Sequence, residues 1–194
     1  MIRNHTELLN AMASKYSLNN YLEIGVQSKS QNYNKIICPN KTGVDPAVVE
    51  PGIARMTSDA YFNLIENNNP LPSFDLIFID GDHTKEQVKR DFENSLRFLS
   101  DTGFIVIHDV LPENEAGTIV PRETKQWWGD VYKWAMTIKT YSNTRVKTFN
   151  IDNGCMLVWK ECHDEWAVID RQINWENYLE QRKFWMNVTD AVEI

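Results

Sequence analysis

The sequence predicts one α/β domain with a doubly wound, mostly parallel sheet, helices on both faces and an antiparallel hairpin near its C-terminal end. Strand-like and helix-like patterns alternate as far as residue 139. Two runs, 74–80 and 103–109, are almost continuously apolar, which is typical of parallel strands buried on both faces. Asp152-Asn153-Gly154 separates two later strand-like runs, and Asn-Gly at such a place favours a hairpin.

The helix predicted over residues 84–99 has the most regular pattern. Thr84 and Gln87 form a capping-box pattern at its start, and segment 100–103 predicts a turn after it. Its apolar residues recur at helical spacing and form one face: Val88, Phe92, Leu96 and Leu99. The other predicted helices are 5–14, 28–37, 59–67 and 123–139, with more helix within 163–188. The predicted strands are 20–26, 41–45, 53–57, 74–80, 103–109, 145–151 and 154–160.

Length and charge narrow the class of protein. A chain of 194 residues suits a single domain, and a net charge of −7 is the wrong sign for a protein that binds phosphate backbones. Three cysteines with no CxxC spacing favour reduced thiols over a disulfide framework. The N-terminal segment lacks the apolar stretch of a signal peptide, and no run approaches a membrane span. We expect a cytoplasmic domain that binds neither nucleic acid nor membrane.

In such sheets ligands bind beyond the carboxyl ends of the strands, so the residues at those ends matter most. Gly25 follows the first strand and allows a tight turn, but the dinucleotide pattern GxGxxG is absent because Gln27 and Ser30 replace glycines. This favours a site for a smaller polar group, or an ordinary turn. Asp45 ends the second strand, where an acidic residue can accept the hydroxyls of a ribose or cap the turn before Pro46.

Acidic and imidazole groups gather at the ends of the next strands. Asp80, Asp82 and His83 follow the run at 74–79, and His108 with Asp109 ends the run at 103–107. If these strands are neighbours, the groups converge on one edge, which suggests a general base, a divalent metal site, or both. Asp82 also suits a cap for the next helix, and His108 an ordinary hydrogen-bonded histidine. Thr57-Ser58-Asp59 likewise suits either a ligand site or a helix N-cap.

Taken together, these segments resemble class I S-adenosylmethionine-dependent methyltransferases, in particular the small branch called methyltransferase domain 24. The matching segments are YLEIGV, GVDP, TSDAYF, FDLIFIDGDHTKEQVKRDFENSLRFL, GFIVIHDVLP and WGDVYK, from about residue 20 to 160. The resemblance implies a Rossmann-like, seven-stranded sheet with a core at about 18–160 and a helical extension at 161–194. It also implies O-methylation of a small-molecule or sugar hydroxyl.

The resemblance also assigns roles by position. Glu23, Gly25 and Gln27 would contact the methionine part of the cofactor. Asp45 would bind the hydroxyls of the ribose, and Ser58 and Asp59 would contact adenine. Asp80 would face both cofactor and acceptor, and His83, His108 and Asp109 would lie on the catalytic, acceptor side. The segment 129–133 would shape the acceptor pocket. Lys29 replaces a common small residue, and the first motif keeps one glycine where many relatives have two or three.

The mechanism implied is in-line displacement, with the acceptor hydroxyl deprotonated. His83 or His108 is the predicted base, because an ordinary imidazole titrates near neutrality, with Asp80 or Asp109 orienting it. Alternatively, Asp80 and Asp109 hold Mg²⁺, which lowers the pKa of the acceptor. Metal-dependent relatives carry Asn or Asp where this chain has Val110, which disfavours the metal.

Other functions stay open. Asp80-Gly81-Asp82 fits the DxD pattern of glycosyltransferases that use a nucleotide sugar and a metal. A catalytically idle cofactor-binding or scaffold protein is a second alternative, and a nicotinamide dehydrogenase is disfavoured by the missing glycines. All seven tryptophans lie in the last third of the chain, which suits core packing, an acceptor pocket or a homodimer through the C-terminal segment.

Overall fold

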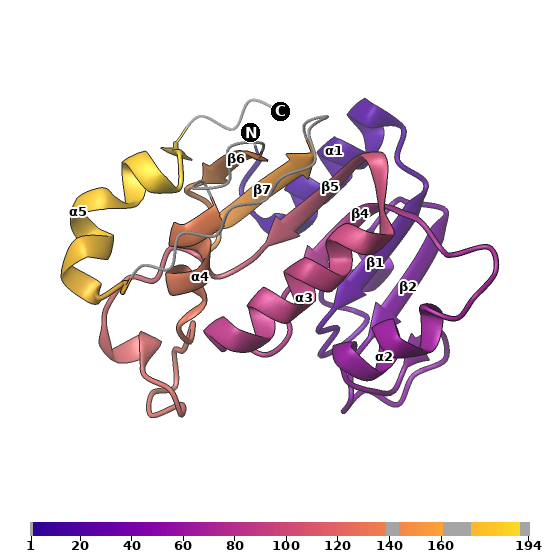
Figure 1. Cartoon of the computed structure of the whole chain (residues 1–194), viewed down its shortest axis with the longest axis horizontal. Helices are drawn as coiled ribbons and strands as arrows, with labels where there is room; N and C mark the ends of the chain where they lie inside the picture. The colour runs from indigo at the N-terminus through magenta and orange to yellow at the C-terminus, as the bar shows by residue number, and fades with distance from the viewer. Residues whose placement is uncertain (1, 139–143, 161–171, 191–194) are drawn as a thin grey trace.

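The computed structural model describes residues 2–138, 144–160 and 172–190, and within these ranges the chain forms one eight-stranded sheet (Figure 1). The strand order is β3-β2-β1-β4-β5-β7-β6-β8. β1 to β5 run parallel, β7 is antiparallel to both of its neighbours, and β8 is parallel to β6. The strands are β1 Asn20–Ile24, β2 Asn40–Val44, β3 Ile53–Ala54, β4 Phe74–Ile79, β5 Leu99–Ile107, β6 Thr144–Phe149, β7 Cys155–Lys160 and β8 Val188–Thr189.

The predicted α/β class and the hairpin are confirmed, while the strand count differs by one. The additional strand, β8, has two residues, and its Val188 pairs with Thr148 of β6. It follows α5 directly, and both Tyr178 and Met186 from this part of the chain are buried in the main core. The C-terminal segment therefore completes one edge of the sheet.

Helices cover the two faces of the sheet unequally. α1 packs on one face, whereas α2, α3 and α4 lie side by side over the other, and α5 follows at the β6 end (Figure 1). Because strand side chains alternate, Ile77 and Ile79 of β4 enter the core under α2 to α4, while Leu76 and Phe78 enter the core under α1. The helices are α1 His5–Tyr16, α2 Ser58–Ile65, α3 Lys85–Phe98, α4 Val131–Ile138 and α5 Trp175–Trp185.

The β4–α3 unit agrees well with its prediction. Thr84 is the N-cap of α3, where its side chain accepts the backbone N–H of Gln87, and Val88 and Phe92 are buried as the stripe requires. The predicted turn at 100–103 is wrong. β5 begins at Leu99, directly after α3, and a register irregularity opposite Phe74 to Leu76 absorbs the added length.

The helix predicted at 28–37 is also wrong, since this segment contains only the 3₁₀ turn Tyr33–Lys35. Polar groups of this segment form hydrogen bonds with distant residues instead of bonding within a helix. Lys41 Nζ donates to the carbonyl oxygens of Tyr33 and Ile36 at 2.9 and 3.1 Å, and Asn32 Nδ2 donates to the buried carboxylate of Glu23 at 2.9 Å. The side chain of Asn32 thereby anchors the segment beside β1.

Two further predicted elements are shorter than expected. Of the strand predicted at 53–57, only Ile53 and Ala54 pair as a strand, and Thr57 is already the N-cap of α2. Of the helix predicted at 123–139, only Val131–Ile138 is helical, because Gly129 has φ +63 and interrupts it. Residue 139 lies outside the described part of the chain. Within the described ranges, every helix is too short or too polar to cross a bilayer.

Candidate active site

Strand register brings the predicted site residues to one edge of the sheet. Ile24 of β1 pairs with Val44 of β2 and with Ile79 of β4, and Ile79 pairs with Ile107 of β5. The residues that follow these four strands therefore lie in a row across the carboxyl edge: Gly25, Asp45, Asp80 and His108. The prediction that β4 and β5 are neighbours, on which the convergence of their polar residues depends, is confirmed.

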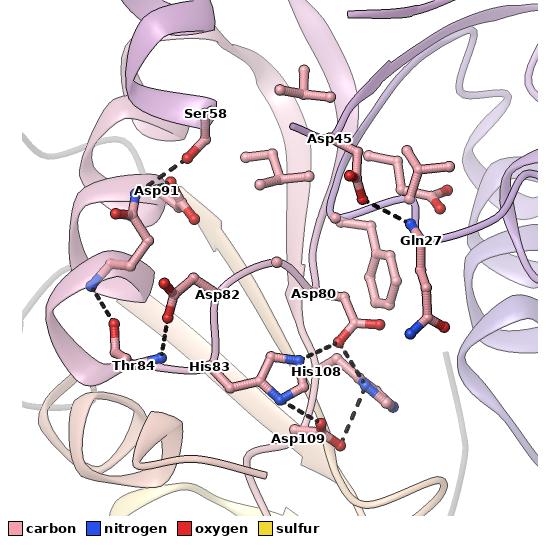
Figure 2. Close-up of a pocket in the computed structure, with 18 of the residues that line it drawn as sticks. Gln27, Asp45, Ser58, Asp80, Asp82, His83, Thr84, Asp91, His108 and Asp109 are labelled. Carbon is pink, nitrogen blue, oxygen red and sulfur yellow. Dashed lines mark hydrogen bonds and ion pairs between the residues drawn. The ribbon is translucent and has the colours of Figure 1, made fainter. Parts of the chain in front are cut away.

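A cavity of about 910 Å³ opens along this edge, and its lining reaches from α2 and α3 at one end to the loop before α4 at the other. Figure 2 shows Ser58 and Asp91 at one side, Asp45 with Gln27 at another, and His83 and His108 together with Asp80 and Asp109. Most of the predicted site residues line this cavity. Asp59 does not, because its carboxylate turns toward Arg90 of α3, 3.3 Å away.

The predicted cofactor residues of the first two strands share this cavity. Gly25 has φ +85, and a Cβ atom there would lie 2.1 Å from the carbonyl oxygen of Asp80, so the β1 turn tolerates glycine alone. Asp45 Oδ2 accepts the backbone N–H of Gln27 at 2.8 Å, while its Oδ1 accepts those of Ala47 and Val48. Asp45 therefore joins the loops after β1 and β2 while lining the cavity.

Glu23 is buried inside the wall of the cavity. Its Oε2 accepts the hydroxyl of Tyr21 at 2.7 Å and the amide of Asn32 at 2.9 Å. Burial raises the pKa of Glu23 to about 7, although these two hydrogen bonds act in the opposite direction. The carboxyl group can thus change its protonation state near neutral pH inside the site.

The opposite end of the cavity is formed by α2 and α3. Gln87 Nε2 donates to Ser58 Oγ at 3.1 Å and to Asp91 Oδ1 at 2.9 Å. Asp91 is fully buried and burial raises its pKa to about 6, while its Oδ2 has no hydrogen-bond partner among the described residues. Ser58 lines the cavity together with Gln87 and Asp91, two residues of α3 that were not predicted as site residues.

Two imidazoles and two carboxylates form a compact cluster after β4 and β5. His83 Nδ1 lies 3.2 Å from Asp109 Oδ2, and its Nε2 lies 3.6 Å from Asp80 Oδ1. His108 Nδ1 lies 3.1 Å from the same Asp80 oxygen and 3.4 Å from Asp109 Oδ1. Asp109 adopts φ +57, a conformation uncommon outside glycine, as the chain turns away from β5.

Burial and neighbouring charges together shift the pKa values of the cluster, and burial raises that of Asp109. Burial alone would lower the pKa of His108, but the Asp80 charge and the nearby carboxylates of Asp152 and Asp109 raise it well above its usual value. Burial also acts to lower the pKa of His83, but the hydrogen bond and charge of Asp80, with the charge of Asp109, outweigh it, so this pKa is raised. The imidazoles in turn hold the pKa of Asp80 well below its usual range despite burial. Because both ring nitrogens of each imidazole lie within 4 Å of a carboxylate oxygen, His83 and His108 suit donating hydrogen bonds more than accepting a proton.

The same cluster offers ligands for a divalent ion. Asp80, His83 and Asp109 each present one ligand atom, and these atoms lie within 4.8 Å of one another. From the sequence, Asp80 and Asp109 were an alternative metal-binding pair, which Val110 disfavours. Asp82 takes no part in this group, because its Oδ1 accepts the backbone N–H of Thr84 at 3.0 Å at the start of α3.

The loop before α4 covers the cluster. Trp127 stacks on the ring of His83 with centroids 5.4 Å apart and planes at 9°, and Arg122 also lines the cavity. Asp130 fixes this loop, since its Oδ1 accepts the backbone N–H of Lys85 at 2.7 Å. Trp128 and Trp134 are buried in the core, so the tryptophans divide between packing and the site. Trp166 lies outside the described residues, and the predicted dimer stays a prediction.

Two residues next to the cluster were missed from sequence altogether. Asp152, in the β6–β7 turn, lies 3.8 Å from His108 Nε2, and His5 of α1 lies 2.5 Å from Asp152. The antiparallel hairpin carried a usable signal for Asp152, because β7 pairs with β5 and its first residues must lie at the carboxyl edge. No sequence pattern marks His5, although it lines the cavity.

The comparison with protein families concerns the part of the chain that contains β1 to β5. Residues 22–110, from β1 to the end of β5, match the model of a methyltransferase domain family. The predicted methyltransferase family is thereby confirmed for the segment that contains Glu23, Gly25, Asp45, Asp80 and the His–Asp cluster.

Solved methyltransferases have the same fold. An O-methyltransferase from Bacillus cereus in complex with SAH shows 16% identity and a TM-score of 0.59 over 80% of each chain. The O-methyltransferase TomG from Streptomyces achromogenes in complex with SAM shows 14% identity and a TM-score of 0.57 over 80% of this chain and 78% of TomG. The SAH-bound methyltransferase PaMTH1 from Podospora anserina shows 14% identity and a TM-score of 0.56 over 80% of this chain and 77% of PaMTH1. The class of fold is thus that of methyltransferases.

Proposed function

We propose that this methyltransferase domain transfers a methyl group from S-adenosylmethionine to a hydroxyl of a small molecule or sugar. The observation that carries the proposal is the cavity at the carboxyl edge, which joins Glu23, Gly25 and Asp45 to the cluster around Asp80 and His108. The first three occupy the positions that the resemblance assigns to the cofactor. The match to a methyltransferase domain supports this cofactor, and two of the similar structures hold SAH and one holds SAM.

The residues present suit that cofactor. The cavity volume, about 910 Å³, falls in the range of pockets that enclose a small ligand. Asp45 would accept the ribose hydroxyls, Glu23 and the turn at Gly25 would hold the methionine part, and Ser58 would lie toward adenine. Bound in this way, S-adenosylmethionine supplies an activated methyl group. Asp59 stays a prediction without a place in the cavity wall.

The acceptor would bind at the other end of the cavity. His83, stacked on Trp127, offers hydrogen bonds beside an aromatic surface, which suits a phenol or a sugar ring. Asp80 and Asp109 accept hydrogen bonds from hydroxyls while they hold the two imidazoles in place. This end therefore positions the acceptor oxygen, a contribution that can amount to several kcal/mol.

Asp80 and Asp109 have a second role to test, that of holding Mg²⁺. A divalent ion bound there lowers the pKa of an acceptor hydroxyl. Turnover measured before and after EDTA treatment distinguishes the two roles. Loss of turnover that added Mg²⁺ restores assigns the carboxylates to a metal, whereas unchanged turnover assigns them to orienting the histidines and the acceptor.

Calorimetry with S-adenosylmethionine and S-adenosylhomocysteine tests the cofactor. We expect micromolar binding, and an affinity lower by about tenfold or more in Asp45→Asn, since a hydrogen bond to a charged group contributes about 1.5–3 kcal/mol. Asp101→Asn is the matched control, because Asp101 is exposed on β5 and lies outside the cavity wall. Absence of binding in the unaltered protein refutes the proposal.

The remaining alternatives predict different outcomes of the same experiments. Cofactor binding without turnover of any hydroxyl compound would indicate a catalytically idle protein. Binding of a UDP-sugar with Mn²⁺ would indicate the DxD glycosyltransferase, for which the comparisons give no support. The carboxylate of Asp82 accepts the backbone N–H of Thr84 at the start of α3, so Asp80 lacks the second carboxylate that a DxD pair needs.

A further inference from the structure

His5 lines the cavity and pairs with Asp152, and the proposed function gives this pair no role. Asp152 Oδ2 lies 2.5 Å from His5 Nδ1 and also accepts the backbone N–H of His5 at 3.1 Å. A carboxylate oxygen accepts and cannot donate. The contact therefore places the proton of a neutral imidazole on Nδ1 and leaves the lone pair on Nε2.

Both members of the pair are held in place. The His5 ring stacks on Phe78 with centroids 5.2 Å apart, and its other neighbour is the ring of His108 at 4.9 Å. Asp152 has φ +48 within the β6–β7 turn, and the backbone N–H of Leu111 binds the carbonyl of Asn153 at 2.8 Å, which fastens that turn behind β5. The geometry of the pair is thus set by α1, β4 and the hairpin together.

His5 differs from the other two cavity histidines in what surrounds its nitrogens. Both ring nitrogens of His83, and both of His108, lie within 4 Å of a carboxylate oxygen. His5 has one nitrogen on Asp152, and no hydrogen bond or ion pair within the described ranges uses the other. Since His5 lines the cavity, its Nε2 is the imidazole nitrogen best arranged to accept a proton there.

We propose that His5 Nε2 is the proton acceptor for the substrate hydroxyl and that Asp152 is its positioning residue. This rests on the proposed methyl transfer. The acceptor oxygen forms a bond to the methyl carbon while the bond between that carbon and sulfur breaks. The electron pair of the breaking bond stays on sulfur. The hydroxyl proton passes to Nε2, the resulting imidazolium is stabilised by Asp152, and the proton then leaves to solvent.

Nuclear magnetic resonance on protein labelled with ¹⁵N-histidine tests the tautomer without any acceptor. The spectrum, recorded with S-adenosylhomocysteine at alkaline pH so that the neutral form is observed, contains four histidines, and His5→Gln assigns the His5 signals. We expect the His5 proton on Nδ1, and a larger fraction on Nε2 in Asp152→Asn. A His5 proton on Nε2 in the unaltered protein, or an unchanged tautomer in Asp152→Asn, overturns the assignment.

Turnover gives the second readout, with whichever compound of a phenol and sugar panel the unaltered protein methylates. A placed base contributes about 10²–10⁴-fold, so we expect a loss of that size in His5→Gln. Binding of S-adenosylhomocysteine should stay within about twofold. Glu7→Gln, at a half-buried side chain of α1 that pairs with Arg3 outside the cavity wall, should behave as the unaltered protein. Full turnover in His5→Gln overturns the base assignment alone. Failure of the unaltered protein to bind the cofactor overturns the methyltransferase proposal instead, and the tautomer measurement still reports on the pair.

Discussion

Replacing Glu23 by Gln should make the stability of the protein less dependent on pH. Glu23 is 1% exposed, and burial raises its pKa from an ordinary 4.5 to about 7. A carboxyl group whose pKa is raised in the folded state binds more protons there than in the unfolded chain. It therefore opposes folding increasingly as pH rises from about 4.5 to about 7 and reaches a constant penalty above that.

The magnitude follows from the displacement of the pKa. At about 1.4 kcal/mol for each pH unit, the shift to about 7 corresponds to about 3 kcal/mol of lost stability once Glu23 is ionised. Glutamine has nearly the same shape, carries no charge, and keeps an oxygen that can accept from Tyr21 and Asn32. We expect the free energy of unfolding of Glu23→Gln, relative to the unaltered protein, to rise by about 2–3 kcal/mol between about pH 5 and about pH 8.

Urea unfolding followed by tryptophan fluorescence measures this difference at each pH. Asp91, whose pKa burial raises to about 6, also changes its protonation state in this range, but both proteins retain Asp91, so its contribution largely cancels in the difference. Glu93→Gln is the control, because Glu93 is an exposed residue of α3 that pairs with Lys89 at 3.8 Å. A difference between Glu23→Gln and the unaltered protein that stays constant from acid to alkaline pH would show that Glu23 is not buried as a proton-binding carboxyl.

Three further outcomes are expected. Gly25→Ala should destabilise the protein by at least about 2 kcal/mol and weaken cofactor binding, because its Cβ atom would meet the Asp80 carbonyl at 2.1 Å; Gly52→Ala, with a similar φ of +82 and open space around it, isolates the clash from the backbone strain. Trp127→Ala should raise the KM for the acceptor by roughly three- to tenfold with cofactor affinity unchanged, since it removes a stacked ring from His83, and Trp127→Phe should restore most of the loss; an unaffected KM would place the acceptor elsewhere. Asp45→Asn should weaken binding of S-adenosylhomocysteine in calorimetry, as set out above, and equal affinities would remove Asp45 from the cofactor site.

Local patterns determined the elements that have strong periodicity or turn chemistry. A short window of sequence was enough to predict three elements: the strand at 74–79, the helix whose apolar stripe contains Val88 and Phe92, and the turn at Asn153-Gly154. The order of these elements also implied a parallel sheet, and hence that the polar residues after β4 and β5 meet at its edge. That is why the sequence alone was enough to group Asp80, His83, His108 and Asp109.

Elements with weak local preference followed their tertiary contacts instead. Segment 28–37 is not helical because Lys41 and Glu23 bind its polar groups. β5 begins as early as Leu99 because Leu99 pairs with Phe74 of β4 and its carbonyl oxygen accepts a hydrogen bond from Lys160 Nζ at 3.2 Å. In both cases a contact distant in sequence outweighs a propensity of a few tenths of a kcal/mol per residue.

By itself, the sequence determined the class of fold, the edge of the sheet that carries the site, and most of the residues gathered there. Only the tertiary structure decided their electrostatic states, because a pKa depends on burial and on charges contributed by separate strands. It also decided which residues join the site from outside the strand ends. His5 and Asp152 are 147 positions apart, yet they meet because α1 packs under β4 while the hairpin pairs with β5.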